Sequence, residues 1–214
     1  LPKASAPQPV VLVIGGSEGG LGASGKLARG LADAGFAALA VAYFGHPGLP
    51  EQLLELPLER FDDALAWLRS DPRVLGSRVA ILGGSKGAEA ALLVAATHPE
   101  IAAVIVGAPS NVVWQAIDQA NWAVRSSWTR AGEPLAFVPY DAEGPFWPLV
   151  QMYSRSLAAS AAVSAARIPV ATIKVPVLLV SGEDDQLWPS STMGELLAQS
   201  LAAAGNAQVT HLHY

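Results

Sequence analysis

Residues 83–87 have the sequence Gly-Gly-Ser-Lys-Gly, a G-x-S-x-G pattern with Ser85 at its centre. The run before it, 78–82, is mainly apolar and β-branched and predicts a buried strand, whereas 88–96 consist of strong helix formers. A serine on such a strand-to-helix turn is held in a strained backbone conformation with its hydroxyl exposed. The adjoining helix N-terminus directs backbone N–H groups at a nearby oxyanion. The pattern therefore favours a catalytic nucleophile at Ser85 over a structural glycine turn.

The composition limits the class of protein. Hydrophobic residues make up 51% of the 214 residues and charged residues 14%, which suits one domain built on a parallel sheet buried on both faces. A net charge of −5 provides no basic surface for nucleic acid, and no apolar run reaches the roughly 18 residues of a membrane span. The lack of cysteine excludes disulfides and thiolate metal ligands. We expect no metal, no cofactor, no nucleic-acid or membrane partner and, by default, a cytoplasmic location; the oligomeric state stays open.

Predicted strands and helices alternate along the chain. The apolar runs that predict strands are 9–14, 36–43, 78–82, 101–106, 175–181 and 208–214. The segments that predict helices are 23–34, 58–70, 88–96 and 191–204. This order predicts an α/β fold with a mainly parallel, doubly wound sheet and right-handed crossovers. We expect residues 1–214 to form a single domain that is truncated at both ends, since the chain opens at Leu1 without a methionine.

Residues 109–168 interrupt this alternation. The segment is rich in aromatic residues, which are Trp114, Trp122, Trp128, Phe137, Tyr140, Phe146, Trp147 and Tyr153. In a doubly wound fold, ligands bind beyond the carboxyl ends of the strands, where long insertions also lie. We expect this segment to be an insertion or lid. Its aromatic side chains either wall a pocket for an apolar acyl group or form a satellite core beneath a long loop.

An oxyanion hole for Ser85 needs two backbone donors. The loop 15–20, Gly-Gly-Ser-Glu-Gly-Gly, follows the first predicted strand and is small and open. We expect the N–H groups of Ser17 and Lys86 to hold the oxyanion, with Glu18 as the alternative to Ser17. The Lys86 side chain is expected to be solvated at the start of the helix, or else to bind an anionic group of the substrate.

The acid of a catalytic triad is expected after a later strand. The sequence 181–185, Ser-Gly-Glu-Asp-Asp, follows a buried apolar run and comes after Ser85 in the chain. Asp185 is the better-placed carboxylate and Asp184 the second choice. A solvated acidic turn or a cation site is the alternative interpretation of the same residues.

The general base is harder to place among the four histidines, His46, His98, His211 and His213. His98 ends the helix that follows Ser85, where a cation suits the helix dipole, so we expect a structural role. His46 precedes the serine in the chain, and the other two lie inside the last predicted strand. A triad histidine usually follows that strand. We therefore expect the catalytic histidine beyond Tyr214, with His213 as a distant second candidate.

The chain resembles the α/β-hydrolase domain of the family of acyl-CoA thioester hydrolases and bile acid-CoA:amino acid N-acyltransferases, a neighbour of the dienelactone hydrolases. The most specific matches are Gly-Ser-Lys-Gly-Ala-Glu at 84–89 and Gly-Glu-Asp-Asp-x-x-Trp at 182–188. The remaining matches lie at 15–20, 35–37, 42–44, 49–50, 168–170 and 188–190. The resemblance thus extends over nearly the whole chain.

This resemblance implies an activity. In that family a serine or cysteine on the elbow attacks an acyl thioester, which implies Ser85 as the nucleophile, Asp185 as the acid and a histidine a few residues beyond Tyr214. The implied function is hydrolysis of a small-molecule substrate, either an acyl-CoA thioester or a carboxylic ester, through an acyl-enzyme. The alternatives are acyl transfer, a dienelactone-hydrolase-like carboxylesterase, and a non-catalytic scaffold if the histidine is absent. Such proteins often carry an N-terminal β-sandwich domain, which these 214 residues do not include.

Nucleotide binding is the main competing interpretation of the glycine-rich loop. Short-chain dehydrogenases need a Tyr-x-x-x-Lys pair, and no tyrosine in this chain has lysine four residues later. The P-loop-like run 20–27 has Leu27 where serine or threonine would hold magnesium. Both nucleotide-binding interpretations fail on these residues.

Overall fold

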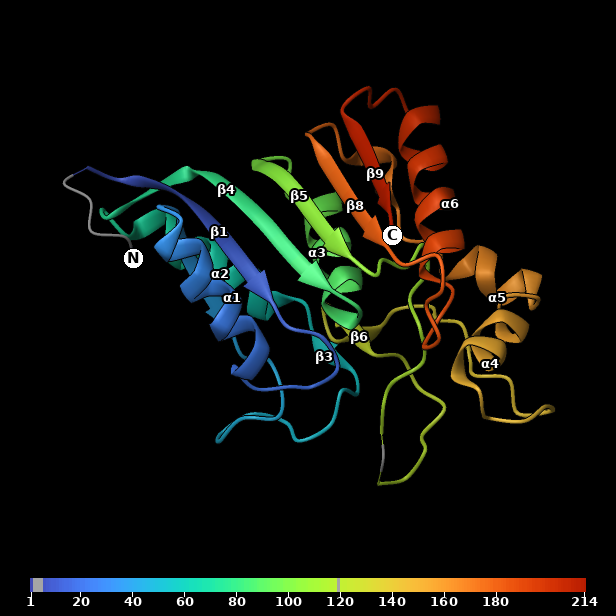
Figure 1. Ribbon diagram of the computed structural model, residues 1–214. Helices are drawn as coiled ribbons and strands as arrows, with labels where there is room; N and C mark the ends of the chain where they lie inside the picture. Colours follow the sequence, from blue (N-terminus) through green and yellow to red (C-terminus); the bar gives the residue numbers. More distant parts are fainter. Residues whose placement is uncertain (2–5, 119) are drawn as a thin grey trace.

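The computed structural model describes residues 1, 6–118 and 120–214. Its main sheet has six parallel strands in the order β2-β1-β4-β5-β8-β9 (Figure 1). In chain order the strands are β1 Gln8–Ile14, β2 Ala37–Val41, β4 Val74–Gly84, β5 Ile101–Gly107, β8 Val177–Ser181 and β9 Val209–His213. The predicted α/β class and the parallel sheet are confirmed.

Helices connect the strands, as parallel pairing requires. They are α1 Gly22–Asp33, α2 Glu59–Ser70, α3 Lys86–Thr97, α4 Leu149–Ser156, α5 Ser160–Ala165 and α6 Ser190–Ala203, with a short 3₁₀ helix η1 at Val170–Thr172. Within the described part of the chain, no helix is long and apolar enough to cross a membrane.

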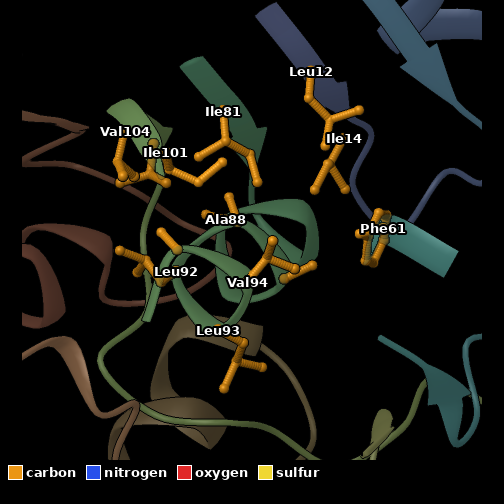
Figure 2. Close-up of a cluster of buried hydrophobic side chains, with 14 of the residues drawn as sticks. Leu12, Ile14, Phe61, Ile81, Ala88, Leu92, Leu93, Val94, Ile101 and Val104 are labelled. Atoms are coloured by element: carbon orange, nitrogen blue, oxygen red, sulfur yellow. The ribbon is translucent and has the colours of Figure 1, made fainter. Parts of the chain in front are cut away.

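The main core lies between the sheet and α3. Side chains alternate across a strand, so Leu12 and Ile14 of β1 point to the same face as their neighbour Ile81 of β4. Figure 2 shows these three residues directed toward α3. Every residue of α3 from Lys86 to Ala95 is buried. The helix that follows Ser85 is therefore enclosed by protein on all sides, which holds its N-terminus in a fixed place.

The opposite face of the sheet is only partly covered. In the described residues α1 is the only helix on this side, and Ser24 is its only buried residue. Leu82, Ile105 and Leu178 are register neighbours on this face and are each only half-buried. A parallel sheet is normally covered on both faces. The chain thus leaves an apolar strip of β4, β5 and β8 open beside α1.

The segment that follows β5 lies at the carboxyl ends of the central strands (Figure 1). It contributes β6 Trp128–Arg130 and β7 Glu133–Pro134, which join β3 Leu56–Pro57 in a small sheet of order β3-β6-β7. It also builds a second apolar cluster with Trp188 of the β8–α6 turn. The members of this cluster are Val112, Trp114, Val138, Met152, Tyr153, Ala166, Trp188 and Met193.

Candidate active site

Ser85 lies at the junction of β4 and α3 with φ 53° and ψ −122°. Its N–H donates a hydrogen bond to the carbonyl of Gly107 at 2.9 Å, and its own carbonyl accepts the N–H of Ala88 at 2.8 Å. The first bond ties the turn to β5 and the second begins the helix. A positive φ is costly for a residue with a side chain and persists only where the surroundings impose it.

Two glycines permit this turn because backbone passes where a Cβ would stand. A Cβ on Gly83 would lie 2.1 Å from the carbonyl oxygen of Gly87. A Cβ on Gly87 would lie 2.4 Å from the carbonyl oxygen of Gly15 and 2.6 Å from that of Ile14. The G-x-S-x-G spacing therefore reflects close backbone contacts. Gly83 contacts the backbone across the turn, and Gly87 contacts the end of β1.

Replacing Gly87 with alanine is expected to lower the free energy of unfolding by at least about 1–3 kcal/mol, because the clash is with backbone that cannot rotate away. Urea denaturation followed by circular dichroism measures this change. Gly84→Ala is the matched control, since a Cβ on Gly84 meets nothing within 4 Å. Equal stability of the two variants would contradict the close approach of the β1 backbone to Gly87.

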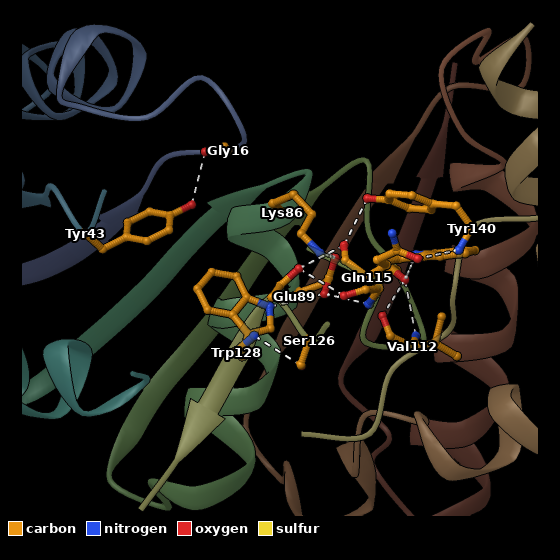
Figure 3. A network of polar contacts seen from close by, with 12 residues as sticks. Gly16, Tyr43, Lys86, Glu89, Val112, Gln115, Ser126, Trp128 and Tyr140 are labelled. Carbon is orange, nitrogen blue, oxygen red and sulfur yellow. Dashed lines mark hydrogen bonds and ion pairs between the residues drawn. The ribbon is translucent and has the colours of Figure 1, made fainter. Parts of the chain in front are cut away.

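The glycine-rich loop after β1 is held beside Ser85. Tyr43 donates its hydroxyl to the carbonyls of Gly15 at 2.7 Å and Gly16 at 3.0 Å (Figure 3). Burial, followed by the charges of two glutamates, raises the pKa of Tyr43 well above its usual value, so the hydroxyl remains a donor. A Cβ on Gly16 would lie 3.4 Å from the Cβ of Ser85. The structure thus brings the loop predicted to carry an oxyanion donor next to the predicted nucleophile.

The two predicted oxyanion donors are free. In the described residues, neither the backbone N–H of Ser17 nor that of Lys86 donates a hydrogen bond. Glu18, the alternative, instead accepts the N–H of Gly16 at 3.1 Å through its carboxylate. The bond to the Glu18 carboxylate does not involve the Glu18 backbone N–H, so Ser17 stays the predicted second donor and Glu18 the alternative.

An apolar cavity of about 490 Å³ adjoins Ser85. Its rim includes Gly16, Ser85 and Ala108 at the carboxyl ends of β1, β4 and β5. Its floor runs along the open face of the sheet, over Leu82 and Ile105, toward α1. Ser85 therefore faces a space with apolar walls, although the cavity lies mostly on the sheet face and not under the aromatic segment.

The Lys86 side chain is not solvated, contrary to the expectation from sequence. Lys86 is 1% exposed and Glu89 is fully buried, and their charged atoms lie 2.5 Å apart (Figure 3). Burial lowers the pKa of Lys86 and raises that of Glu89, while the pairing of the two opposes both shifts. A lysine at the first position of a helix commonly faces water. Here the segment 109–168 covers that position, which no local pattern indicates.

Glu89 ties the elbow helix to this covering segment. Its Oε2 accepts the backbone N–H of Trp114 at 3.1 Å and the indole N–H of Trp128 at 3.2 Å. The Lys86 ammonium lies 6.0 Å from the centre of the Trp128 ring. Figure 3 shows the pair at the centre of a wider polar network that reaches Gln115 and Tyr140. This network was not predicted from the sequence, in which Glu89 stands out only as the last residue of the motif at 84–89.

Asp185 is held rigidly in the turn after β8. One carboxylate oxygen accepts the N–H groups of Leu187 and Trp188 at 2.9 and 3.3 Å, and the other accepts the hydroxyl of Ser190 at 2.6 Å. Asp185 is half-buried, whereas Asp184 is exposed and accepts a hydrogen bond from the Gln186 side chain. The geometry favours Asp185 over Asp184 as the ordered carboxylate.

No histidine in the described residues makes a hydrogen bond to Ser85. His98 donates to the carbonyl of Val94 at 3.0 Å, which supports the structural role expected for it. His213 shares a hydrogen bond with Ser191 of α6 at 3.2 Å. Its strand is the third from β4, which corresponds to roughly 14 Å at the usual spacing of neighbouring strands. The structure therefore gives no support to His213 as the partner of Ser85.

The aromatic segment contains a cavity of its own, of about 260 Å³. Trp114 and Trp128 are fully buried, whereas Trp122 and Trp147 are 63% and 70% exposed. Both exposed tryptophans line this cavity together with Tyr140. Trp114 belongs to the second apolar cluster, whereas Trp122 and Trp147 wall a cavity, so the segment contains both a satellite core and a cavity. That this cavity takes an acyl group stays a prediction.

Comparison with known proteins identifies the family. The family described as BAAT / Acyl-CoA thioester hydrolase C terminal matches residues 56–214. This chain belongs to that family. The match begins at β3 and includes the elbow, the acidic turn and β9, and it agrees with the resemblance seen in the sequence motifs.

Relatives in this family include acyl-coenzyme A thioesterases. The chain is 30% identical over 207 residues to human acyl-coenzyme A thioesterase 6, covering 96% of this chain and 47% of that protein. It is 31% identical over 207 residues to mouse acyl-coenzyme A thioesterase 5, with the same coverage. A mouse acyl-coenzyme A amino acid N-acyltransferase 1 is 37% identical over 105 residues, which cover 49% of this chain and 25% of that protein. The chain thus spans about half the length of the thioesterases that it matches.

Solved structures show the same fold. A carboxylesterase from a metagenomic library superposes with a TM-score of 0.62 at 19% identity, over all of this chain and 71% of the esterase. A dienelactone hydrolase-like phosphotriesterase from metagenomic libraries superposes with a TM-score of 0.59 at 20% identity, over 99% of this chain and 71% of that protein. The predicted α/β-hydrolase fold is confirmed for this family member.

Proposed function

We propose that this chain forms the catalytic part of a hydrolase that cleaves acyl thioesters, such as acyl-CoA, or carboxylic esters. The observation that carries the proposal is the backbone of Ser85, held at a φ of 53° between β4 and α3. Strain of this kind concentrates at functional sites and exposes the serine hydroxyl above the sheet. The names of the thioesterase relatives support a thioester substrate.

The proposed reaction has two steps. The Ser85 hydroxyl attacks the carbonyl carbon of the substrate while a base takes its proton, and the N–H groups of Ser17 and Lys86 hold the oxyanion. The oxyanion collapses and expels the thiol or alcohol, which takes a proton from the base and leaves an acyl-enzyme. Water, deprotonated by the same base, then releases the acid and restores Ser85.

The general base is a further part of the proposal. Since no histidine in the described residues bonds to Ser85, we propose that the base is a histidine from outside residues 1–214. Asp185 would orient it, because its carboxylate is fixed by three donors at the carboxyl edge of the sheet. Acyl transfer to an amine is a second candidate, supported by the N-acyltransferase relative.

The direct test is covalent labelling of this chain with a fluorophosphonate probe, with and without added imidazole to act as the base. We expect one adduct, assigned to Ser85 by peptide mass spectrometry, that forms faster in imidazole. Hydrolysis of aryl esters and acyl-CoA thioesters is then measured under the same conditions. No adduct and no hydrolysis in imidazole would reject Ser85 as the nucleophile.

A further inference from the structure

A cluster of metal-ligating side chains lies at the β9 edge of the main sheet, three strands away from β4 and Ser85. His211 and His213 are two residues apart on β9 and therefore share one face of the strand, and Glu195 of α6 packs against that face. One ring nitrogen of each histidine and one carboxylate oxygen of the glutamate all lie within 4.8 Å of one another. The mechanism proposed above uses none of these residues.

His211 provides the strongest sign of a ligand. Its side chain is 7% exposed, and its Nδ1 has no hydrogen-bond partner in the described residues. That nitrogen lies 3.9 Å from Oε2 of Glu195, while Nε2 shares a hydrogen bond with Ser181 at 2.8 Å. A buried polar nitrogen without a partner is costly. The Nδ1 of His211 is thus aimed at a carboxylate across a gap that one ion would bridge.

The packing around His211 orients the ring. A Cβ on Gly194 would lie 2.6 Å from Nε2 of His211, so only glycine at this position lets the ring lie against α6. The rings of His211 and His213 are close, with centres 3.8 Å apart. Burial, then the neighbouring His213, lowers the pKa of His211. Gly194 and the neighbouring His213 ring together hold the ring of His211 against α6, close to Glu195.

We propose that Glu195, His211 and His213 form a binding site for a divalent transition-metal ion of the zinc class. Imidazole with one carboxylate suits Zn²⁺ and its neighbours in the first transition row better than Ca²⁺ or Mg²⁺, which prefer oxygen ligands. Ligand atoms around tetrahedral zinc lie roughly 3.4 Å apart at metal–ligand distances of about 2.1 Å. The three ligand atoms, now within 4.8 Å of one another, need to move closer by little more than about 1 Å. The Glu195 side chain is 54% exposed and, within the described ranges of the chain, is held only by a surface hydrogen bond from Gln199, so it can make this movement.

A metal at this site would join α6 to β9. Helix α6 starts at Ser190, whose hydroxyl holds the carboxylate of Asp185. The ion would therefore stabilise the element that orders the acidic turn. From the sequence we expected no metal. The ligands come together only through the tertiary packing of α6 against β9, which no sequence motif indicates.

The test is titration of the chain with Zn²⁺, with Ca²⁺ as the control ion, followed by calorimetry and thermal unfolding. We expect one Zn²⁺ per chain and a rise in Tm of roughly 5–10 °C at free zinc about 100-fold above Kd. Glu195→Gln and His213→Gln are expected to weaken binding at least about 100-fold. His46→Gln, which changes an exposed histidine elsewhere, is expected to bind zinc normally.

Both tested side chains are exposed, so the variants should fold, and circular dichroism checks this. Visible absorption of bound Co²⁺ reports whether the ligand set is tetrahedral, independently of any enzymatic activity. The proposal is overturned if zinc does not bind, if Ca²⁺ raises the Tm equally, or if Glu195→Gln and His213→Gln bind zinc as tightly as the unaltered chain.

Discussion

Replacing Ser85 with alanine is expected to lower the imidazole-supported hydrolysis of esters and acyl-CoA at least about 10³-fold, because the variant cannot form an acyl-enzyme. Alanine keeps the Cβ that serine already places in the strained turn, so the fold should be unchanged. The phenol released from an aryl ester is measured by its absorbance, and the thiol released from acyl-CoA with a colorimetric thiol reagent. The chain itself contributes no background, since it contains no cysteine.

Ser200→Ala is the matched control for this prediction. Ser200 is a half-buried serine on α6, away from Ser85, whose hydroxyl donates to the carbonyl of Leu196. We expect its variant to keep full activity and full labelling by the fluorophosphonate. Activity of Ser85→Ala within tenfold of the unaltered chain would assign hydrolysis to another group.

Replacing Lys86 with alanine is expected to lower the free energy of unfolding by about 3–5 kcal/mol, since it leaves the buried carboxylate of Glu89 without its cation. The unpaired carboxylate would also disturb the Trp128 indole and the Trp114 backbone, because both donate hydrogen bonds to it. Urea denaturation measures the loss.

A double variant separates charge pairing from packing. Lys86→Met with Glu89→Gln removes both charges yet keeps an oxygen that accepts the two tryptophan N–H groups, so we expect it to recover most of the lost stability. Arg69→Ala is the surface control, because the Arg69–Glu100 pair at 2.7 Å is about 40% exposed on both sides and should contribute no more than about 1 kcal/mol. A Lys86→Ala variant as stable as Arg69→Ala would show that the buried pair is not required.

Local patterns predicted the regular elements well and the irregular ones poorly. The predicted strand 101–106 and helix 58–70 differ from β5 and α2 by one residue at an end, because apolar periodicity and helix propensity are local properties. Helices α4 and α5 lie in the segment expected to be irregular. They are short and pack within a second cluster, so their stability comes from tertiary contacts that a sequence window does not contain.

The candidate site divides in the same way. The serine on its turn, the glycine-rich loop and the acidic turn are each specified by a short motif, since each depends on backbone geometry that few residue types permit. The sequence already favoured Asp185 over Asp184 and Ser17 over Glu18. The hydrogen bonds of the folded chain add that the Asp185 carboxylate is held by several donors.

The sequence by itself determined the parallel α/β fold, the position of Ser85 on its turn and membership of the thioester hydrolase family, because these depend on residue order and local conformation. Only the tertiary structure decided that Lys86 is buried against Glu89, that His213 faces α6, and that His211 meets Glu195. These contacts depend on the order of the strands in the sheet and on the segment 109–168 that covers α3. Burial and charge pairing are properties of that packing, and they arise only when distant parts of the chain meet.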